Sequence, residues 1–373
     1  MNVVLAFDKF KGCATSQQLN EAARQALSDT FPSVKVDCVP VADGGDGTVE
    51  VLAATRQGQW LMMQAPGPLL QLPPVNARYY LCEDGTAFIE VAAASGLALV
   101  PDQARDVIRA TTLGTGLLMR DAMEHGSQHI VLGLGGSATC DAGMGIMSAL
   151  GAEFTDSDGH YLYPCGESLE IIRHIETRGI PQEVLDCRFT LLTDVDNPLC
   201  GKNGTASVYS PQKGASAQQV EQLERGMQHI AAIIGENCAS QAGCGAAGGI
   251  PALMSHLLDC QLLAGAPYIL AENGLDQALE HADLVITGEG RLDRQTMMGK
   301  GPGQVIQMAQ RLGVPVAAIC GLVDKDFDVP AAGLKSVMAV SDGLPLEEAI
   351  SPVGTLARVA TAATSLIGSL LTD

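Results

Sequence analysis

The feature that most constrains this chain is the alternation of short, wholly apolar runs with segments of helical periodicity. Near the N-terminus, Val3-Val4-Leu5-Ala6-Phe7 is such a run, and a helix is predicted to follow it with Ser16 as its cap. The same pattern recurs near the C-terminus, with strands predicted at 283–287, 314–320 and 336–340 and helices at 304–312 and 353–371. Because strands that are apolar on both sides are typical of sheets covered by two helix layers, the sequence predicts an α/β fold with a parallel sheet.

The middle of the chain is less regular, although the same elements recur there. Further strands are predicted at 34–39, 79–82, 87–91, 130–134 and 189–194, and further helices at 48–56 and 141–150. A length of 373 residues, at roughly 150 residues per domain, favours two domains, with one inserted in the other.

Charge and cysteine usage limit the partners and the compartment. The net charge of −20 would repel phosphate backbones and anionic lipid headgroups, so neither nucleic acid nor a membrane is expected as a partner. The 11 cysteines are scattered without a CxxC pair, which indicates reduced thiols. No signal-peptide pattern is present, and no uninterrupted apolar run approaches the ~18 residues of a membrane helix, so we expect a soluble, cytoplasmic protein.

Glycines cluster beside polar residues at the ends of the predicted strands. Of the 42 glycines, 16 lie in six such windows, which also hold seven of the 22 cations. The windows are 8–12, 43–48, 133–143, 194–204, 210–215 and 288–303. Cations placed among glycine loops in so acidic a protein indicate local pockets for an anion.

The clearest of these loops is Gly133-Leu134-Gly135-Gly136-Ser137-Ala138-Thr139, which follows a strand and is expected to open a helix. Its N–H groups, the helix N-terminus and the Ser and Thr hydroxyls could cradle a phosphate. It is neither a Walker loop nor GxGxxG. A tight strand-to-helix turn with a capping Ser or Thr is the alternative.

Two further loops place carboxylates at strand ends. In 288–293, Glu289 and Asp293 flank Arg291 and could hold Mg²⁺ or act as a base while the guanidinium binds a carboxylate or phosphate; a surface salt-bridge turn is the alternative. This loop and those at Asp8 and Asp43 could face one site, because ligands bind at the carboxyl ends of parallel strands. Asp194-Val195-Asp196-Asn197-Pro198 offers a similar carboxylate and amide pair, or a plain Asn-Pro turn.

Taken together, these motifs resemble the type I, two-domain glycerate kinase family of bacteria. The matching segments, in family order, are Asp8-Lys9-Phe10-Lys11-Gly12, residues 42–48, Gly135 to Thr139, Asn197-Pro198-Leu199, Pro211 to Gly214, Gly245 to Gly249, Thr287 to Asp293, Gln295-Thr296 and Gly299-Lys300. The chain departs from the family at Phe7 (usually Pro), Lys9 (usually Ser) and Cys140 (usually Asn).

The resemblance implies ATP-dependent phosphorylation of D-glycerate, commonly at the 2-hydroxyl, with Mg²⁺. It also implies a flavodoxin- or Rossmann-like α/β domain built from both chain ends, here 1–62 and 280–373. A second α/β domain, 63–279, would be inserted, with the active site in the cleft between the two. Homo-oligomers are compatible with this expectation.

Residue roles follow as hypotheses within the same resemblance. ATP would be bound by Gly135, Gly136, Ser137, Ala138, Thr139, Gly248, Gly249 and Lys300. Lys11 or Lys213 would neutralise the transferring group, and Arg291 would clamp the glycerate carboxylate. Asp194 is the first choice for the base and Asp46 the second, while Asp194, Glu289 and Asp293 are candidate Mg²⁺ ligands. Glu289 and Asp293 are also candidates for binding the substrate hydroxyls. The remaining substrate candidates are Asp8, Lys9, Asp43, Gly44, Gly45 and Asn197.

Three alternatives stay open. Phosphorylation at the 3-hydroxyl would give 3-phosphoglycerate. The Gly-Gly-Ser-Ala-Thr loop is also similar to a loop of the galactokinase and mevalonate kinase superfamily, although the other motifs are not shared. A non-catalytic sugar-acid sensor would keep the binding site, but the chain has no basic segment for an attached DNA-binding module.

Overall fold

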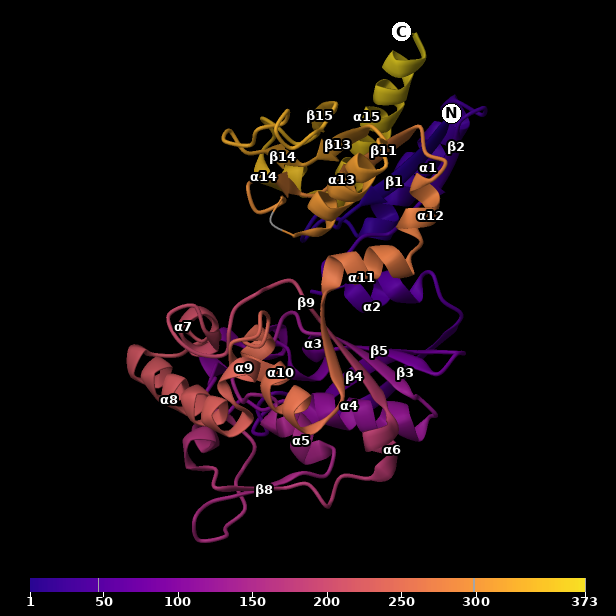
Figure 1. Ribbon diagram of the computed structural model, residues 1–373. Coiled ribbons are helices and arrows are strands. Elements are labelled where there is room, and N and C mark those ends of the chain that lie inside the picture. The colour runs from indigo at the N-terminus through magenta and orange to yellow at the C-terminus, as the bar shows by residue number, and fades with distance from the viewer. Residues whose placement is uncertain (46, 298, 373) are drawn as a thin grey trace. The chain divides into compact units, whose positions relative to one another are not determined.

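The computed structural model describes residues 1–45, 47–297 and 299–372 (Figure 1). The chain forms two compact units: unit 1 comprises Met1–Asp43 and Gly265–Asp373, and unit 2 comprises Gly44–Ala264. These bounds differ from the 62/63 and 279/280 boundaries expected from the sequence. Residues 58–62 belong to a strand that pairs along its whole length inside unit 2, and Leu270, Leu275 and Leu279 are core residues of unit 1.

Unit 1 is built on a parallel sheet. Its strands are β1 (Asn2–Phe7), β2 (Lys35–Cys38), β11 (Leu284–Gly288), β13 (Val316–Cys320) and β15 (Ser336–Ala339). They lie in the order β2-β1-β11-β13-β15, and every neighbouring pair is parallel. Counted along the chain, this is the flavodoxin-like order 2-1-3-4-5, so the predicted fold class is confirmed.

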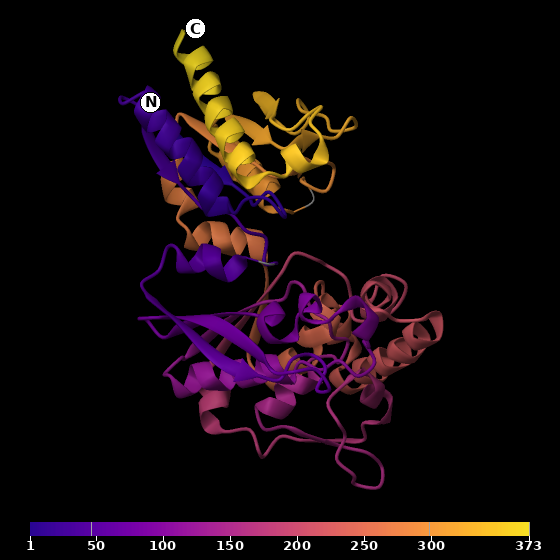
Figure 2. The same cartoon turned by 180° about the vertical axis from the view of Figure 1, so that it is seen from behind.

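Helices cover both faces of this sheet. They are α1 (Ser16–Thr30), α11 (Gly265–Glu272), α12 (Leu275–Leu279), α13 (Gly301–Arg311), α14 (Leu346–Ala349) and α15 (Pro352–Thr372). Val3, Leu5 and Phe7 of β1 pack against α1 and α15, which Figure 2 shows side by side. Val4 and Ala6 face α11, α12 and α13 on the other side. The apolar run at the N-terminus is therefore buried on both faces, as its composition predicts. A two-stranded parallel ladder, β12 (Arg291–Leu292) with β14 (Leu322–Val323), completes the unit.

The start of α1 differs from the sequence prediction by one residue. The N-cap is Thr15, whose side chain accepts from the Gln18 N–H at 3.2 Å while Gln18 Oε1 accepts from the Thr15 N–H at 3.0 Å. This capping box satisfies two N–H groups that the helix cannot. Ser16, the expected cap, instead donates to the Phe7 carbonyl at 2.6 Å, which ties the loop after β1 to the helix.

The closing helix α15 is long and apolar enough to cross a membrane, with a mean hydropathy of 1.2 over Pro352–Leu371. A third of that window is buried, 33%. Val359, Ala363 and Ile367 are wholly buried in the same core as α1. Its apolar stripe therefore packs in the interior of unit 1.

Unit 2 is built on a mixed six-stranded sheet. Its strands are β3 (Gly58–Ala65), β4 (Val75–Cys82), β5 (Thr86–Glu90), β6 (His129–Gly133), β9 (Arg188–Thr193) and β10 (Cys260–Ala264). The order is β10-β9-β6-β5-β4-β3; β4 is antiparallel to both of its neighbours, β3 and β5, and the pairs β5–β6, β6–β9 and β9–β10 are parallel. A small antiparallel ladder joins β7 (Glu153–Thr155) and β8 (His174–Glu176).

The helices of unit 2 supply one large core. The α-helices are α2 (Thr48–Ala53), α3 (Val91–Ser95), α4 (Leu113–Glu124), α5 (Met144–Ala149), α6 (Gln182–Asp186), α7 (Thr205–Tyr209), α8 (Ala217–Ile234), α9 (Glu236–Ala239) and α10 (Ala246–Leu257). Short 3₁₀ turns lie at Leu97–Leu99, Asp102–Ala104, Gly166–Ile171 and Pro211–Lys213. Residues of α4, α5, α8 and α10 pack with one face of the strands in a single cluster, while α2 contacts β4 and β5.

Candidate active site

The carboxyl ends of β1 and β11 form a polar edge in unit 1. The two strands pair in register to their last residues, Phe7 beside Gly288, and the Asp8 N–H donates to the Gly288 carbonyl at 2.8 Å. Asp8 and Glu289 are thus the first residues beyond two neighbouring strands. In a sheet of order 2-1-3-4-5, the first and third strands mark the switch point, beyond which such folds bind ligands.

Asp8 is a buried carboxyl, 5% exposed. Its Oδ1 accepts from the Lys9 N–H at 2.7 Å, and a Cβ placed on Gly301, the first residue of α13, would lie 3.3 Å from its Oδ2. Burial raises the pKa of Asp8 to about 7; the Lys9 charge opposes this rise, and the like charges of Asp43 and Glu289 add to it. Near neutral pH this group can therefore accept or release a proton.

Glu289 is held by the turn that follows it. Thr296 Oγ1 donates to Glu289 Oε1 at 2.5 Å and accepts from the Asp293 N–H at 3.0 Å, so Thr296 joins the two acidic residues. Asp293 Oδ1 accepts from the N–H groups of Gln295 and Thr296. Burial raises the pKa of Glu289, against the Thr296 hydrogen bond and the charge of Lys300. Thr296 is wholly buried, and the sequence reasoning gave it no role.

The cations of unit 1 differ in how they are placed. Lys9 Nζ lies 3.6 Å from Asp43 Oδ1, and both side chains are largely covered. Lys300 occupies the N-cap position of α13 without a side-chain capping bond, and its Nζ donates to Gln295 Oε1 at 3.2 Å. Arg291 instead pairs with Asp324 at 2.9 Å on the exposed ladder β12–β14, and its side chain is 60% exposed. Arg291 therefore forms a surface salt bridge, as the alternative interpretation of loop 288–293 predicts, but its partner, Asp324, lies outside that loop.

In unit 2, the loop after β6 exposes a row of backbone donors. The Ala138 N–H donates to the Ser95 carbonyl, and the Gly136 carbonyl accepts from Leu97, each at 2.8 Å. Among the residues that the structure describes, no backbone carbonyl accepts from Gly135, Gly136 or Ser137. Gly136 adopts φ +70°, a conformation that favours glycine. Three successive N–H groups are therefore available to an anion.

Lys213 holds this loop in place. Its Nζ donates to Ser137 Oγ and to the Thr139 carbonyl, each at 2.8 Å, and the residue is only 4% exposed. Burial lowers the pKa of Lys213 to about 8, although Cys140 and Asp141 oppose that shift. Thr139 is wholly buried, and its Oγ1 has no hydrogen-bond partner within the described chain. The Lys213 ammonium is thus hydrogen-bonded to the loop through one hydroxyl oxygen and one carbonyl oxygen.

The helix after this loop begins later than the sequence predicts, at Met144 rather than about Asp141. Neither Ser137 nor Thr139 caps it, so the alternative interpretation of this loop, a turn with a capping Ser or Thr, is wrong. The physical reason is Asp141, a buried carboxylate that accepts from Thr112 N–H and Oγ1 at 2.8 Å and from the N–H groups of Gly143 and Gly145 at 3.2 Å. The N–H groups at the start of α5 are therefore used inside the protein.

Gly248 and Gly249 lie in a left-handed kink inside α10, together with Ala247. A Cβ on Gly248 would stand 2.1 Å from the Thr139 carbonyl oxygen, and one on Gly249 would stand 2.8 Å from Leu199 Cδ1. The structure thus brings the glycine pair against the backbone that ends the anion loop. Gly248 and Gly249 therefore have to be glycines, because a side chain at either position would overlap its neighbours.

Asn197 and Asp194 lie beyond the end of β9. Asn197 Oδ1 accepts from Tyr209 Oη at 2.5 Å, and its Nδ2 donates to the Asn203 carbonyl at 2.7 Å, so this amide fixes the loop. Asp194 is exposed. Burial raises the pKa of Tyr209 to about 12, and the charges of Asp194 and Asp196 add to the rise. Tyr209 was not singled out by the sequence.

The other predicted residues divide between the two units. Lys11 is exposed in unit 1. Gly44 and Gly45 belong to unit 2, where a Cβ on Gly133 would lie 3.4 Å from the Gly44 carbonyl oxygen. Asp46, the second choice for the base, lies outside the described residues. Unit 1 therefore brings together Asp8, Lys9, Asp43, Glu289, Asp293 and Lys300, and unit 2 brings together the anion loop, Lys213, Gly248 and Gly249.

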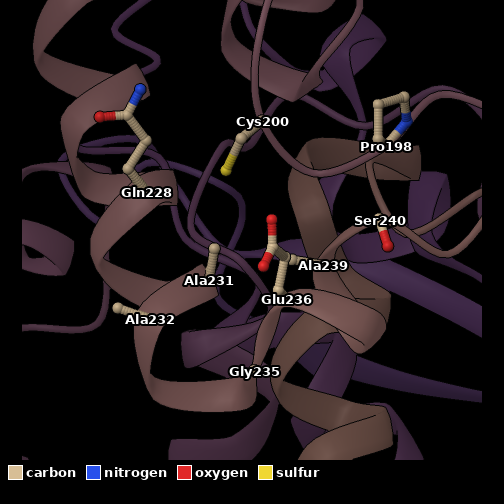
Figure 3. A pocket seen from close by; sticks show the side chains of 9 residues that line it. All are labelled: Pro198, Cys200, Gln228, Ala231, Ala232, Gly235, Glu236, Ala239 and Ser240. Carbon is tan, nitrogen blue, oxygen red and sulfur yellow. The ribbon is translucent and has the colours of Figure 1, made fainter.

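A pocket of about 450 Å³ in unit 2 lies apart from these residues (Figure 3). It is lined by Pro198, Cys200, Gln228, Ala231, Ala232, Gly235, Glu236, Ala239 and Ser240. None of the predicted site residues lines it. Burial raises the pKa of Cys200 to about 11, so its thiol is a poor nucleophile at neutral pH.

One acidic group with metal-like spacing is accounted for by a turn. The carboxylate oxygens of Asp156 and Asp158 and a ring nitrogen of His160 lie within 4.8 Å of one another. Asp156 Oδ1 accepts from the N–H groups of Asp158 and His160, an arrangement that needs no ion. The buried carboxylates near Glu289 are the better match to a Mg²⁺ site, because Mg²⁺ prefers hard oxygen ligands.

Comparison with known proteins identifies similar chains. A model of the glycerate kinase family matches residues 3–368. The chain is 38% identical over 334 residues to a protein of Escherichia coli K12 named glycerate 2-kinase, which covers 88% of this chain and 87% of that one. It is 36% identical over 356 residues to a Bacillus subtilis 168 protein named glycerate kinase, covering 94% and 93%.

A solved structure agrees with these sequence relatives. The crystal structure of a Salmonella typhimurium LT2 protein, described as a glycerate kinase 2, superposes with a TM-score of 0.86 at 36% identity. The superposition covers 100% of this chain and 99% of that one. Similarity of this extent applies to both units.

Proposed function

Because the chain belongs to the glycerate kinase family, we propose that it transfers the γ-phosphoryl group of ATP to the 2-hydroxyl of D-glycerate. The products are 2-phospho-D-glycerate and ADP. The observation that carries the nucleotide part is the row of N–H groups at Gly135, Gly136 and Ser137, with the buried ammonium of Lys213 against the same loop. The name of the Escherichia coli relative supports the 2-position.

The phosphates of ATP bind at this loop. The three N–H groups donate to phosphate oxygens, as in other glycine-rich anion sites. Lys213 acts through the loop: it adds a positive charge beside the donors and fixes Ser137 and the Thr139 carbonyl in one geometry. Because these donors are already in place, they stabilise the negative charge that develops in the transition state without a cost of rearrangement.

D-Glycerate is an acid, and unit 1 offers cations for it. Lys9 pairs with Asp43, and the charge of Lys300 acts on Glu289, so both cations offset the like charges of these carboxylates. In this proposal the substrate hydroxyls bond to the same carboxylates. Arg291 is paired with Asp324 in the structure. In this proposal the carboxylate of glycerate replaces Asp324 as the partner of the guanidinium.

The residues of unit 1 also fit the Mg²⁺ that phosphoryl transfer requires. Glu289 and Asp293 are linked through Thr296, and one oxygen of each remains without a hydrogen bond in the described chain. Glu289 and Asp293 would hold the ion. Bound there, Mg²⁺ would neutralise phosphate oxygens.

Asp194 is the proposed base for the hydroxyl proton. It is exposed directly after the end of β9, where its carboxylate is accessible to solvent. We expect Asp194→Asn to lower kcat by roughly 100-fold or more, since a positioned base contributes about 10²–10⁴. Asp196→Asn, two residues away and also exposed, is the control and should retain activity. Near-normal turnover in Asp194→Asn would assign the proton to another group, and Asp8 would be tested next.

An ADP-release assay tests the whole proposal. The full-length protein is supplied with ATP, Mg²⁺ and D-glycerate, and with related hydroxy acids in parallel. Release that depends on D-glycerate is expected, and ³¹P NMR of the product should show the 2-phosphate ester. A 3-phosphate ester would overturn the position of transfer. Glycerate binding by calorimetry without ADP release would instead support the sensor.

A further inference from the structure

The strand β3 is an edge of the unit 2 sheet, and nothing in the described chain pairs with its outer side. The sheet ends at β3, whose eight residues pair on one side with β4 from Gly58↔Cys82 to Ala65↔Val75. Long unprotected edges are unusual, because a row of main-chain donors and acceptors invites pairing with another strand. We propose that this edge pairs antiparallel with the same strand of a second copy of the chain.

The residues of β3 alternate between a covered and an open face. Leu61 and Met63 pack against the core of unit 2. Trp60 and Met62 point to the opposite face and are 39% and 67% exposed. Arg78 lies 4.2 Å above the Trp60 ring, and Tyr80 packs edge-on against it at 5.3 Å. The open face thus has an ordered cluster of Trp60, Tyr80 and Arg78 beside the exposed Met62, and the charge of Arg78 is paired with Glu50 at 2.6 Å.

Among the edge strands of the two sheets, β3 is the one at which charge least opposes pairing with a second copy. No ionisable side chain occurs from Gln57 to Ala77, although the chain carries a net charge of −20. Two such chains repel each other in general, and this stretch lets them approach with the least repulsion. The other edge strands are shorter: β2 and β15 have four residues and β10 has five, and β2 carries Lys35 and Asp37.

The register of the proposed pair follows from the register inside the sheet. The Glu83 N–H donates to the Gln57 carbonyl at 3.0 Å, so the odd-numbered residues exchange hydrogen bonds with β4. The main-chain groups of Gly58, Trp60, Met62 and Gln64 therefore point to the open edge. A two-fold axis at Leu61 pairs all four, Trp60 with Met62 and Gly58 with Gln64 of the partner copy. Side chains stay on their own faces in this register, and each Met62 meets the partner's Trp60.

Oligomeric state tests the pairing directly. Light scattering after size exclusion of the full-length protein, over the micromolar range, should show a concentration-dependent dimer. Trp60 is the single tryptophan, so its emission should shift to shorter wavelength as the dimer forms. A monomer at every concentration would overturn the proposal.

Met62→Pro removes an N–H that points to the open edge and leaves the bonds to β4 intact. We expect the dimer dissociation constant to rise about 100-fold, because the symmetric pair loses two hydrogen bonds. Met62→Val keeps the N–H and an apolar side chain and should leave the dimer in place. Circular dichroism and kinase turnover check that both variants are folded. A dimer unaffected by Met62→Pro would place the interface elsewhere and reject the proposal.

Cysteine cross-linking tests the register without weakening the edge. Leu61 would face its own copy across the axis, in a non-hydrogen-bonded pair with Cα atoms about 4.5 Å apart, which a disulfide can span. Leu61→Cys should form a covalent dimer when oxidised glutathione is supplied. Met63→Cys, on the same covered face, would stand opposite Gln59 and should not cross-link above the wild-type background. The reverse result would overturn the pairing at Leu61.

Discussion

Lys213 shows how much a residue's surroundings decide its role. A lysine in a Pro-Gln-Lys-Gly turn reads as a surface cation, yet this one is 4% exposed and donates to two oxygens of the anion loop. Its pKa of about 8 reflects that burial. The ammonium is therefore a positioning group for the loop, and the sequence alone did not distinguish this from direct contact with the transferring phosphate.

Replacing Lys213 by Met tests the contribution of its ammonium both to ATP binding and to stability. We expect the KM for ATP to rise about tenfold, since a charge-assisted bond typically contributes about 1.5–3 kcal/mol. Stability should fall by about 1–3 kcal/mol, because the buried Ser137 hydroxyl and Thr139 carbonyl lose their donor. Steady-state kinetics and thermal unfolding measure the two effects. Lys202→Met, in an exposed glycine loop, is the control. An unchanged KM would show that the loop needs no ammonium.

Asp8 should make stability depend on pH in an unusual direction. Its pKa is raised from 3.8 to about 7 in the folded protein. Between these values the folded state keeps a proton that the unfolded state has released, so the contribution of this group to stability falls as pH rises from about 4 to 7. The fully ionised carboxylate then costs on the order of 4 kcal/mol, from about 1.4 kcal/mol per pKa unit.

Asp8→Asn should therefore be more stable than the wild type at pH 8 and nearly equal to it at pH 4. Urea unfolding at the two pH values measures the difference, and Asp342→Asn, at an exposed turn, is the control. Equal stabilities of the two proteins at pH 8 would mean that ionised Asp8 does not destabilise the folded state at that pH.

Thr296 explains why the sequence could not predict such details of the site. Its hydrogen bonds to Glu289 and Asp293 depend on a turn that local sequence patterns do not specify.

Among the elements, α10 depends most on a special backbone. Ala247, Gly248 and Gly249 have φ of +51°, +81° and +83°, so the chain makes a left-handed turn within a segment that also contains Pro251. This turn places Gly248 against Thr139, at the end of the anion loop. The element therefore links the position of the loop to the core of unit 2.

Gly248→Ala should destabilise the protein by about 2–4 kcal/mol, because the added Cβ would overlap the Thr139 carbonyl oxygen in addition to straining the backbone. Gly159→Ala is a matched control: its φ is also +81°, but nothing lies within 4 Å of the added carbon. It should cost only about 1 kcal/mol. Similar losses in both variants would show that strain alone, without the contact, sets the cost.

Elements at the two chain ends could be predicted, and several in the middle could not. The strands of unit 1 are apolar on both sides, so composition alone marks them, as at Leu284–Gly288. The strand β3 was missed because its apolar residues, Trp60 to Met63, are consecutive and precede a proline-rich turn. The 18-residue helix α8 was missed although Ser216 and Gln219 form a capping box before it, a pattern that could have found it.

At the scale of the whole molecule, the chain passes between the units twice, near Asp43 and near Ala264. Unit 2 is one continuous segment with its own large core, whereas unit 1 needs both ends of the chain for its sheet. The sequence predicted this nesting through the resemblance, but not its bounds, because residues 44–62 carry no composition change that marks them as part of either unit.

Residues 44–264 should fold when expressed alone. We expect a cooperative unfolding transition and dispersed amide resonances, because the strands and helices of this unit pack in a single cluster. The complementary pieces, 1–43 and 265–373, should fold only when they are mixed or joined by a short linker. A 44–264 fragment without cooperative unfolding would mean that the unit depends on the rest of the chain.

The place of β1 in the middle of its sheet has a consequence during translation. Phe7 lies beside Gly288, so one flank of β1 has no partner during translation until the inserted unit has been made. At about 5–20 residues per second, that interval is roughly 15–60 s. Throughout it, Val3, Leu5 and Phe7, none of which is exposed in the finished protein, belong to a nascent chain with an open apolar strand. This topology therefore leaves β1 open to non-native pairing for as long as β11 is missing.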